Sequence, residues 1–161
     1  MKEVKIESVL YVYDGVDKLP EDVQGLMAEA RRIRLKAYAP YSDFLVGAAL
    51  LLDNGEIISG NNQENASYPS GLCAERTAIY YAGAHFPDSK ILKMALTAGS
   101  AVSQTMTPIP PCGACRQAIA EYEVKQESPI EIYFMGATGK VAKSNSLSDL
   151  LPLIFDRSVL K

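Results

Sequence analysis

The residues of this sequence best suited to chemistry are its cysteines, two of which form a Cys-x-x-Cys motif. Cys112 and Cys115 stand three positions apart at the start of a predicted helix, so both sulfur atoms lie on one helix face. A helix N-terminus exposes amide groups and carries partial positive charge, which lowers the pKa of a thiol and favours the thiolate that a metal requires. The same spacing is typical of a redox dithiol, and buried structural cysteines are a third reading. The pair alone leaves zinc binding and redox chemistry about equally favoured.

Cys73 favours zinc. It opens a second predicted helix after a long polar loop, so three thiols can converge from two helix N-termini. Three protein ligands leave zinc an open fourth position, as in catalytic sites, whereas a structural site needs a fourth ligand. The single histidine, His85, lies roughly three turns along the helix from Cys73, so we expect an ordinary packed or surface residue there.

Glu75 lies two residues after Cys73, within the first turn of the same predicted helix. A carboxylate there can point past the metal toward the open position, where it is suited to general acid and base catalysis on a water molecule. Acidic residues are also common in first helical turns because they interact favourably with the helix dipole. Taken alone, Glu75 fits that ordinary role better.

Composition and charge exclude several classes of protein. The 161 residues carry 16 basic and 19 acidic side chains mixed along the chain, so no basic stripe can follow a phosphate backbone. No apolar run approaches the roughly 20 residues that span a bilayer, and the N-terminus lacks the apolar core of a signal peptide. We expect a cytoplasmic protein with neither nucleic acid nor membrane among its partners. Its three cysteines cannot all pair as disulfides within one chain.

Hydrophobic periodicity predicts the elements that position these residues. Helices are expected over residues 21–38, 73–86 and 112–124, with Ser146 capping a last helical turn. Strands are expected over residues 1–14, 45–52, 56–59, 91–98, 130–136 and 140–142. Long polar loops are expected over residues 60–72 and 99–111.

This order of elements predicts an α/β fold, a three-layer α/β/α sandwich with a mixed central sheet. The length and the 48% hydrophobic content suit one domain over residues 1–161, in which residues 1–20 form an N-terminal strand extension. The loop over residues 60–72 is rich in Asn, Ser and Gly, as functional loops often are.

The sequence around the cysteines resembles the cytidine deaminase family. Two motifs carry the resemblance, Cys73-Ala74-Glu75-Arg76 and Pro111-Cys112-Gly113-Ala114-Cys115-Arg116-Gln117. They match the signature of zinc deaminases, in which a glutamate that is not a metal ligand moves the protons. Further matching segments follow in the family's order, namely Ala37 to Ser42, Val46 to Ala49, Asn62 to Tyr68, and Leu150 to Phe155.

The resemblance is to the small, three-cysteine, homotetrameric members, in which subunits complete one another's active sites. It implies a cytidine deaminase-like fold with Zn²⁺ on Cys73, Cys112 and Cys115. It also implies hydrolytic deamination of cytidine and 2′-deoxycytidine with release of ammonia, a reaction of pyrimidine salvage. Glu75 is then the proton carrier, and Arg76 hydrogen-bonds the cysteine sulfurs and draws charge off the thiolates.

The resemblance also implies how a nucleoside substrate is held. Asn62 and Glu64 match the pair that binds the ribose hydroxyls, and a glutamate there repels the phosphate of a nucleotide. The alternative is a turn in which both side chains cap nearby backbone. The other implied contacts are the Ala74 amide to the base carbonyl, Phe44 and a neighbouring chain's Phe155 lining the pyrimidine pocket, and Ala66 and Tyr68 reaching a neighbouring subunit's substrate.

Some features depart from the family pattern and leave alternatives open. Residues 69–72 and 109–111, and the tail after Phe155, differ from the commoner family sequences. A deaminase of a related amino-heterocycle, such as a blasticidin-like nucleoside, is one alternative. A non-catalytic zinc-stabilised protein that binds nucleosides is another. A nucleic-acid editor is disfavoured by the acidic balance.

Overall fold

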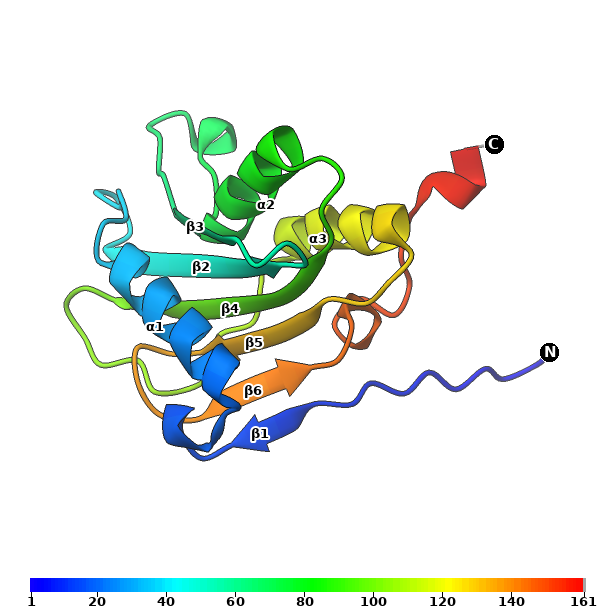
Figure 1. Ribbon diagram of the computed structural model, residues 1–161, viewed down its shortest axis with the longest axis horizontal. Coiled ribbons are helices and arrows are strands. Elements are labelled where there is room, and N and C mark those ends of the chain that lie inside the picture. The colour runs from blue at the N-terminus through cyan, green and yellow to red at the C-terminus, as the bar shows by residue number, and fades with distance from the viewer. Residues whose placement is uncertain (161) are drawn as a thin grey trace.

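A six-stranded mixed sheet forms the centre of the computed structural model, which describes residues 1–160 (Figure 1). The strands lie in the order β1-β6-β5-β4-β2-β3. Their bounds are β1 Tyr11–Tyr13, β2 Phe44–Leu52, β3 Ile57–Asn61, β4 Ile91–Ser100, β5 Glu131–Met135 and β6 Val141–Ser144. Strands β4 and β5 are parallel and the other neighbours antiparallel, so the predicted mixed sheet is confirmed.

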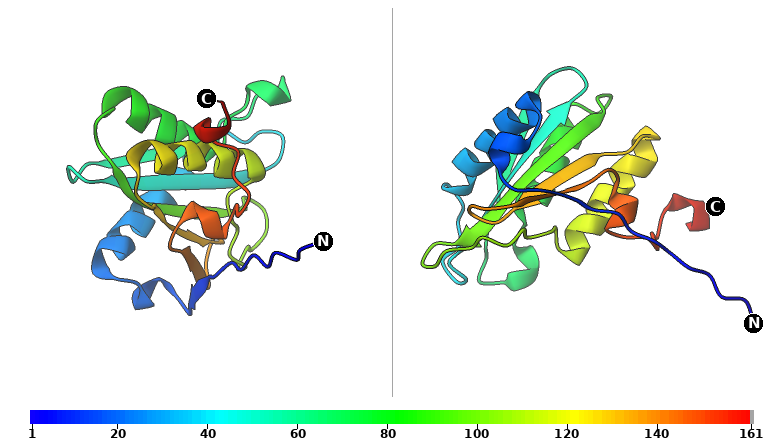
Figure 2. Two further views of the ribbon diagram at one scale, coloured as in Figure 1. Left: turned by 90° about the vertical axis from the view of Figure 1, so that its right-hand side faces the viewer. Right: turned by 90° about the horizontal axis from the view of Figure 1, so that it is seen from below.

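Helices cover both faces of this sheet (Figure 2). Helix α1 (Glu21–Arg34) lies on one face, whereas α2 (Ala74–His85) and α3 (Gly113–Gln126) share the other. The strands supply both cores by alternation, because Ala48 and Leu50 of β2 face α2 while Ala49 faces α1. The three-layer α/β/α sandwich is therefore confirmed. No helix within residues 1–160 has the length and apolar character needed to cross a membrane.

Helix α1 ends earlier than its periodicity predicts. Its buried residues Val23, Leu26, Met27 and Ala30 follow helical spacing, but the helix stops at Arg34 instead of continuing to Tyr38. Tyr38 is held in a different pairing, because its amide donates to Asn62 O at 3.0 Å and its carbonyl accepts from Glu64 N at 2.9 Å. This backbone pairing brings the segment that follows α1 beside the predicted functional loop, residues 60–72.

The N-terminal strand is much shorter than predicted. Only Tyr11–Tyr13 pair, with Val141–Lys143 of β6, and residues 1–10 are extended without strand partners. The expectation of a strand over residues 1–14 was therefore wrong in extent. Strand β6 has only four residues, so it offers few positions for pairing. The expected cap at Ser146 is confirmed, because its side chain accepts from Ser148 N at the start of a short 3₁₀ turn, Leu147–Asp149.

Gly60 sets how closely α2 approaches the sheet. A Cβ atom at Gly60 would lie 2.7 Å from Ala78 N and 2.8 Å from Ala74 O, both backbone atoms of α2. Only glycine permits this contact between strand and helix. Because α2 begins at Ala74, the glycine also fixes the position of the Cys73 end of the helix.

We expect Gly60→Ala to lower the free energy of unfolding by about 1–3 kcal/mol, because the added methyl group pushes α2 off the sheet. Gly25→Ala is the matched control, since a Cβ at Gly25 meets nothing within 4 Å and alanine favours the interior of α1. That substitution should raise the free energy of unfolding by about 0.5–1 kcal/mol. Denaturant unfolding measures both. Equal effects of the two substitutions would contradict the close-packing role of Gly60.

Candidate active site

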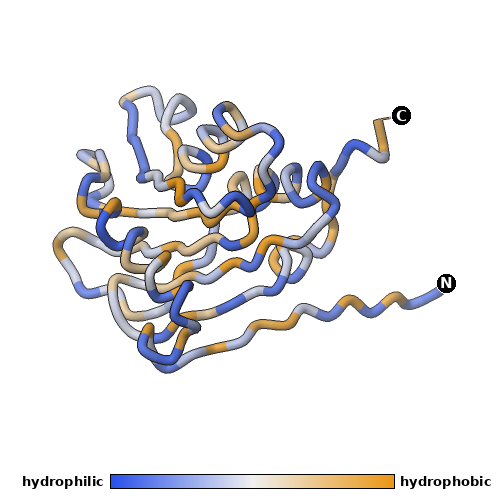
Figure 3. The backbone as a smooth tube through the Cα atoms, viewed as in Figure 1, coloured by the Kyte–Doolittle hydropathy of each residue, from blue (hydrophilic) through white to orange (hydrophobic). Residues whose placement is uncertain are grey.

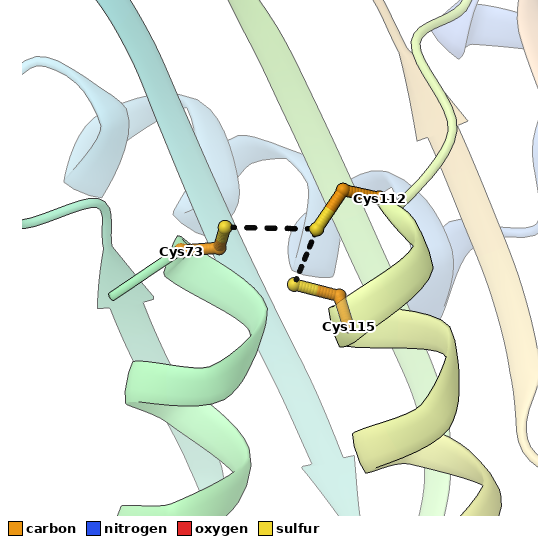
Figure 4. A group of neighbouring side chains, drawn as sticks. All are labelled: Cys73, Cys112 and Cys115. Carbon is orange, nitrogen blue, oxygen red and sulfur yellow. Dashed lines mark hydrogen bonds between the residues drawn. The ribbon is translucent and has the colours of Figure 1, made fainter. Parts of the chain in front are cut away.

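The N-termini of α2 and α3 lie side by side on one face of the sheet, and the sulfur atoms of the three cysteines lie between them (Figure 4). Cys73 is the N-terminal cap of α2, Cys112 is the N-terminal cap of α3, and Cys115 follows in the first turn of α3. The sulfur atoms of Cys73 and Cys112 are 3.8 Å apart, and those of Cys112 and Cys115 are 3.5 Å apart. The predicted convergence of three thiols from two helices is thus confirmed.

The cysteine cluster has the dimensions and chemistry of a zinc site. All three sulfur atoms lie within 4.8 Å of one another. Tetrahedral zinc with Zn–S bonds of about 2.3 Å requires sulfur atoms about 3.8 Å apart. Three adjacent thiols cannot all ionise without a compensating cation, which a divalent metal supplies. The three cysteines therefore fit a zinc ion.

Charge is already unevenly divided within this cluster. A hydrogen bond from Cys115, supported by Arg76 and Cys112, lowers the pKa of Cys73 to about 5 against the opposing effect of burial. The pKa of the Cys115 thiol is raised, because this thiol donates a hydrogen bond to Cys73 and is buried. Cys73 is thus the first thiolate, and a metal ion would displace the proton that Cys115 shares with it.

Glu75 lies in the first turn of α2 with its carboxyl group beside the thiols. The side chain is 5% exposed, and its Oε2 atom has no hydrogen-bond partner within residues 1–160. Burial, with a smaller contribution from the negative charge of Cys73, raises the pKa of Glu75 to about 7. A buried oxygen without a partner is costly unless something binds there. The arrangement suits a carboxyl group that exchanges protons with a bound molecule near neutral pH.

Arg76, the next residue of α2, donates toward the Cys73 sulfur. Its Nη2 atom lies 3.8 Å from Cys73 Sγ, and the thiolate raises the pKa of the guanidinium group. A cation at this distance offsets part of the negative charge that three thiolates would place on a zinc ion.

A cavity of about 640 Å³ opens beside the cysteines and receives most of the predicted site residues. This volume is typical of sites for small molecules. Among the predicted residues it is lined by Cys73, Cys112, Glu75, Arg76, Phe44, Asn62, Glu64 and Tyr68. Sequence reasoning missed other lining residues, among them Tyr41, Ser42, Val46, Leu96 and Ile109.

Asn62 and Glu64 line this cavity and also tie its rim together. Asn62 accepts a hydrogen bond from Val46 N at 2.8 Å and donates one to Phe44 O at 2.9 Å. Glu64 accepts from the amides of Tyr41 and Ser42 at 2.9 and 3.3 Å, and from the Ser42 hydroxyl. These bonds, that of the Ser42 hydroxyl above all, lower the pKa of Glu64. The backbone contacts of the alternative interpretation are therefore present, in residues that face the cavity.

Four predicted residues are not among those that line the cavity within residues 1–160. Cys115 is fully buried in the first turn of α3, after the lining residue Cys112 in sequence. Ala74 is buried between its lining neighbours Cys73 and Glu75. Ala66 lies in the exposed loop before Tyr68. Phe155 is 61% exposed, and its carbonyl accepts a hydrogen bond from Gln117 Nε2 at 2.7 Å. His85 is remote, as expected, and its ring stacks on Tyr81.

Arg116 supports the cysteine-bearing turn and was not singled out from the sequence. Its Nε atom donates to Pro111 O at 2.8 Å, and its Nη1 atom donates to Leu150 O at 2.7 Å. Arg116 thereby fixes the backbone that enters Cys112 and joins it to the C-terminal segment. Its position directly after Cys115 was the available signal.

This site on this fold defines a zinc-binding deaminase, and comparisons with known proteins agree. The model of the cytidine and deoxycytidylate deaminase zinc-binding region matches residues 20–128. A cytidine deaminase of Sporosarcina psychrophila is 39% identical over 139 residues, which cover 86% of this chain and 95% of that protein. One of Halalkalibacterium halodurans is 41% identical over 134 residues, covering 83% and 94% of the two chains.

Solved structures give the same result. The crystal structure of cytidine deaminase from Burkholderia pseudomallei superposes with a TM-score of 0.71 at 37% identity, covering 85% of this chain and 100% of that one. That from Mycobacterium tuberculosis superposes with a TM-score of 0.64 at 30% identity, covering 84% and 98%. This chain belongs to the cytidine deaminase family.

We expect the purified protein to hold about one zinc ion per chain. Cys115→Ser should reduce the zinc content well below that value and lower the thermal midpoint, because it removes a buried ligand from the cluster. Metal analysis and thermal unfolding measure the two effects. A folded, metal-free protein with a disulfide between Cys112 and Cys115 would instead establish the redox dithiol.

Proposed function

We propose that this chain catalyses the hydrolytic deamination of cytidine and 2′-deoxycytidine to uridine and 2′-deoxyuridine, releasing ammonia. The observation that carries the proposal is the buried Glu75 carboxyl group beside three thiols suited to zinc, with its Oε2 atom lacking a hydrogen-bond partner within residues 1–160. The family membership and the named relatives support it. We further propose that residues 1–161 act as one domain, in the cytoplasm, in pyrimidine salvage.

Glu75 carries the protons in the proposed reaction. When bound by Cys73, Cys112 and Cys115, zinc acidifies a water molecule. Glu75 takes a proton from water as the water oxygen attacks C4 of the pyrimidine, and it delivers this proton to N3. It then takes the proton of the new C4 hydroxyl and gives it to the amine, so the C–N bond breaks and ammonia leaves. One carboxyl group acts as base and then as acid, for which a pKa of about 7 is suitable.

The remaining residues of the pocket hold the base and balance charge. Arg76 donates toward Cys73 and draws negative charge off the thiolate. Phe44 lies on the cavity wall and offers an apolar surface for the pyrimidine ring. The amide of Ala74, at the start of α2, is proposed to donate to the base carbonyl.

Asn62 and Glu64 are proposed to bind the ribose. Both line the cavity, and an oxygen accepting one hydrogen bond retains capacity for another. The amides and hydroxyl that lower the pKa of Glu64 keep it ionised at neutral pH. An ionised carboxylate accepts from a free ribose hydroxyl and repels a phosphate, which favours nucleosides over nucleotides.

We also propose that the active enzyme is a homotetramer with shared sites, to which Phe155, Ala66 and Tyr68 contribute across subunit boundaries. Large exposed side chains support this assembly. Tyr68 is 76% exposed, Phe155 is 61% exposed, and Tyr81 of α2 is 50% exposed. Phe155 stands outside the cavity of its own chain, within residues 1–160. A neighbour's cavity is the site it can complete.

Ammonia release should be measured over cytidine, deoxycytidine, cytosine, deoxycytidine monophosphate and blasticidin S. We expect the two nucleosides to be preferred. Glu75→Gln should lower kcat for them by about 10²- to 10⁴-fold, because the amide cannot carry protons. Activity on the nucleotide alone, or on blasticidin S alone, would refute the proposed substrates.

Two controls keep the Glu75→Gln result interpretable. The variant should retain zinc and its thermal midpoint, since glutamine has nearly the same shape. Glu121→Gln, at an exposed position of α3, should leave kcat unchanged. Full turnover by Glu75→Gln would remove Glu75 from the mechanism and favour a different proton carrier.

Shared sites predict complementation between defective chains. Phe155→Ala and Glu75→Gln homotetramers should each have low activity. Co-expressed chains should regain part of it, because a Glu75→Gln chain can lend its Phe155 to an intact carboxylate on a neighbour. Kinetics of the mixed tetramers, separated by tags, test this. If the mixed tetramers are no more active than the average of the two variant homotetramers, Phe155 does not complete a neighbour's site.

A further inference from the structure

Residues 1–10 form an extended arm that leaves β1 and runs away from the rest of the molecule (Figures 1 and 2). All ten residues are exposed, and Val9 N donates to Asp149 Oδ1 at 3.1 Å near the base of the arm. The family model begins at residue 20, and the Burkholderia structure matches over its whole length but only 85% of this chain. The arm therefore lies outside the region that the family model matches.

The arm has the pattern of an amphipathic strand. Side chains of an extended segment alternate between two faces. Over residues 3–7 the apolar Val4 and Ile6 share one face and the charged Glu3, Lys5 and Glu7 share the other, an alternation visible in the hydropathy of the arm (Figure 3). Toward the ends the pattern is mixed, since Lys2, Ser8 and Leu10 lie on the first face and Met1 and Val9 on the second. Ile6 and Val4 are 51% and 73% exposed. An extended segment with exposed apolar side chains and free backbone groups is a template for pairing with another strand.

The charges of the arm are self-complementary about Ile6. Lys5 and Glu7 flank Ile6 on one face, with Nζ and Oε1 2.6 Å apart. If two copies of the arm run antiparallel with Ile6 opposite Ile6, Lys5 of each copy lies opposite Glu7 of the other. Centring on Lys5 would instead place lysine against lysine and Glu3 against Glu7. Centring on Val4 would also place Glu3 against Lys5, but it pairs only residues 1–7, whereas centring on Ile6 pairs residues 2–10. Opposite charges across a strand pair are favourable, and like charges are not.

We infer that the arm pairs with the arm of a second copy of this chain, antiparallel and centred on Ile6. The pairing is isologous, because each copy offers the same surface to the other. It pairs backbone groups of the arm and brings Val4, Ile6 and Leu10 of both copies onto one face. The arm thus links copies of the chain through a contact separate from the cavity.

Cross-linking of Ile6→Cys in the zinc-loaded full chain tests the register. Opposite residues of an antiparallel pair have Cα atoms about 4.5–5.5 Å apart, within the range of a disulfide. Ser8→Cys is the matched control, because Ser8 lies opposite Val4 and its two copies are about 13 Å apart. Mild oxidation should give a covalent dimer of Ile6→Cys on a non-reducing gel and little of Ser8→Cys. Zinc content and deaminase activity should not change in either variant.

Charge substitutions in the Ile6→Cys background separate pairing between chains from the ion pair within one chain. Lys5→Glu and Glu7→Lys each place like charges across the interface, so each should lower the cross-linked fraction about threefold or more. Both also break the ion pair within the chain. The two charge variants should cross-link preferentially with each other when they are co-expressed, because an acidic arm then pairs with a basic one. A tag on one of the chains separates the products by mass.

Two results would overturn the inference. Equal cross-linking of Ile6→Cys and Ser8→Cys would show contact without this register. A failure of the mixed charge variants to recover cross-linking would show that the charges act within one chain.

Discussion

Negative charge crowded between two helix N-termini is the constraint on which this site depends. Three thiols within 4.8 Å of one another repel as thiolates, and the protein offsets that repulsion from several directions. Cys73 caps α2, and a hydrogen bond from Cys115 lowers the pKa of this thiol to about 5. Arg76 adds a full positive charge on the Cys73 side. The residual charge is what a divalent metal neutralises.

Burial is the main cause of the raised pKa of Glu75, and the same negative charge is a smaller one. The cavity wall buries its carboxyl group, and the negative charge of Cys73 adds to the rise in its pKa. A carboxyl group on the surface would be ionised at neutral pH and could not serve as an acid. The close approach of α2 to the sheet at Gly60 positions the first turn of the helix, which carries Glu75.

Much of this arrangement could be predicted from the sequence, because local signals specify it. Helical spacing after Cys73 and Cys112 predicted both helices and the convergence of the thiols. What could not be predicted depends on partners distant in sequence. Helix α1 stops at Arg34, and Tyr38 pairs instead with residues 62–64. Strand β1 extends only over the three residues that pair with β6. Arg116 was missed because its partners include Leu150 O, 34 residues away.

Asn62 and Glu64 combine a structural role with a position suited to binding, because both hold the rim of the cavity and line it. Their bonds to Val46, Phe44, Tyr41 and Ser42 hold the start of β2 against the segment that carries them. Phe44 lies within the section so held and lines the same cavity. Residues suited to grip a ribose therefore also hold the aromatic wall suited to a base. A substitution at Asn62 or Glu64 would disturb both halves of a nucleoside site together, because the fold of the rim and the recognition of the sugar depend on the same polar atoms.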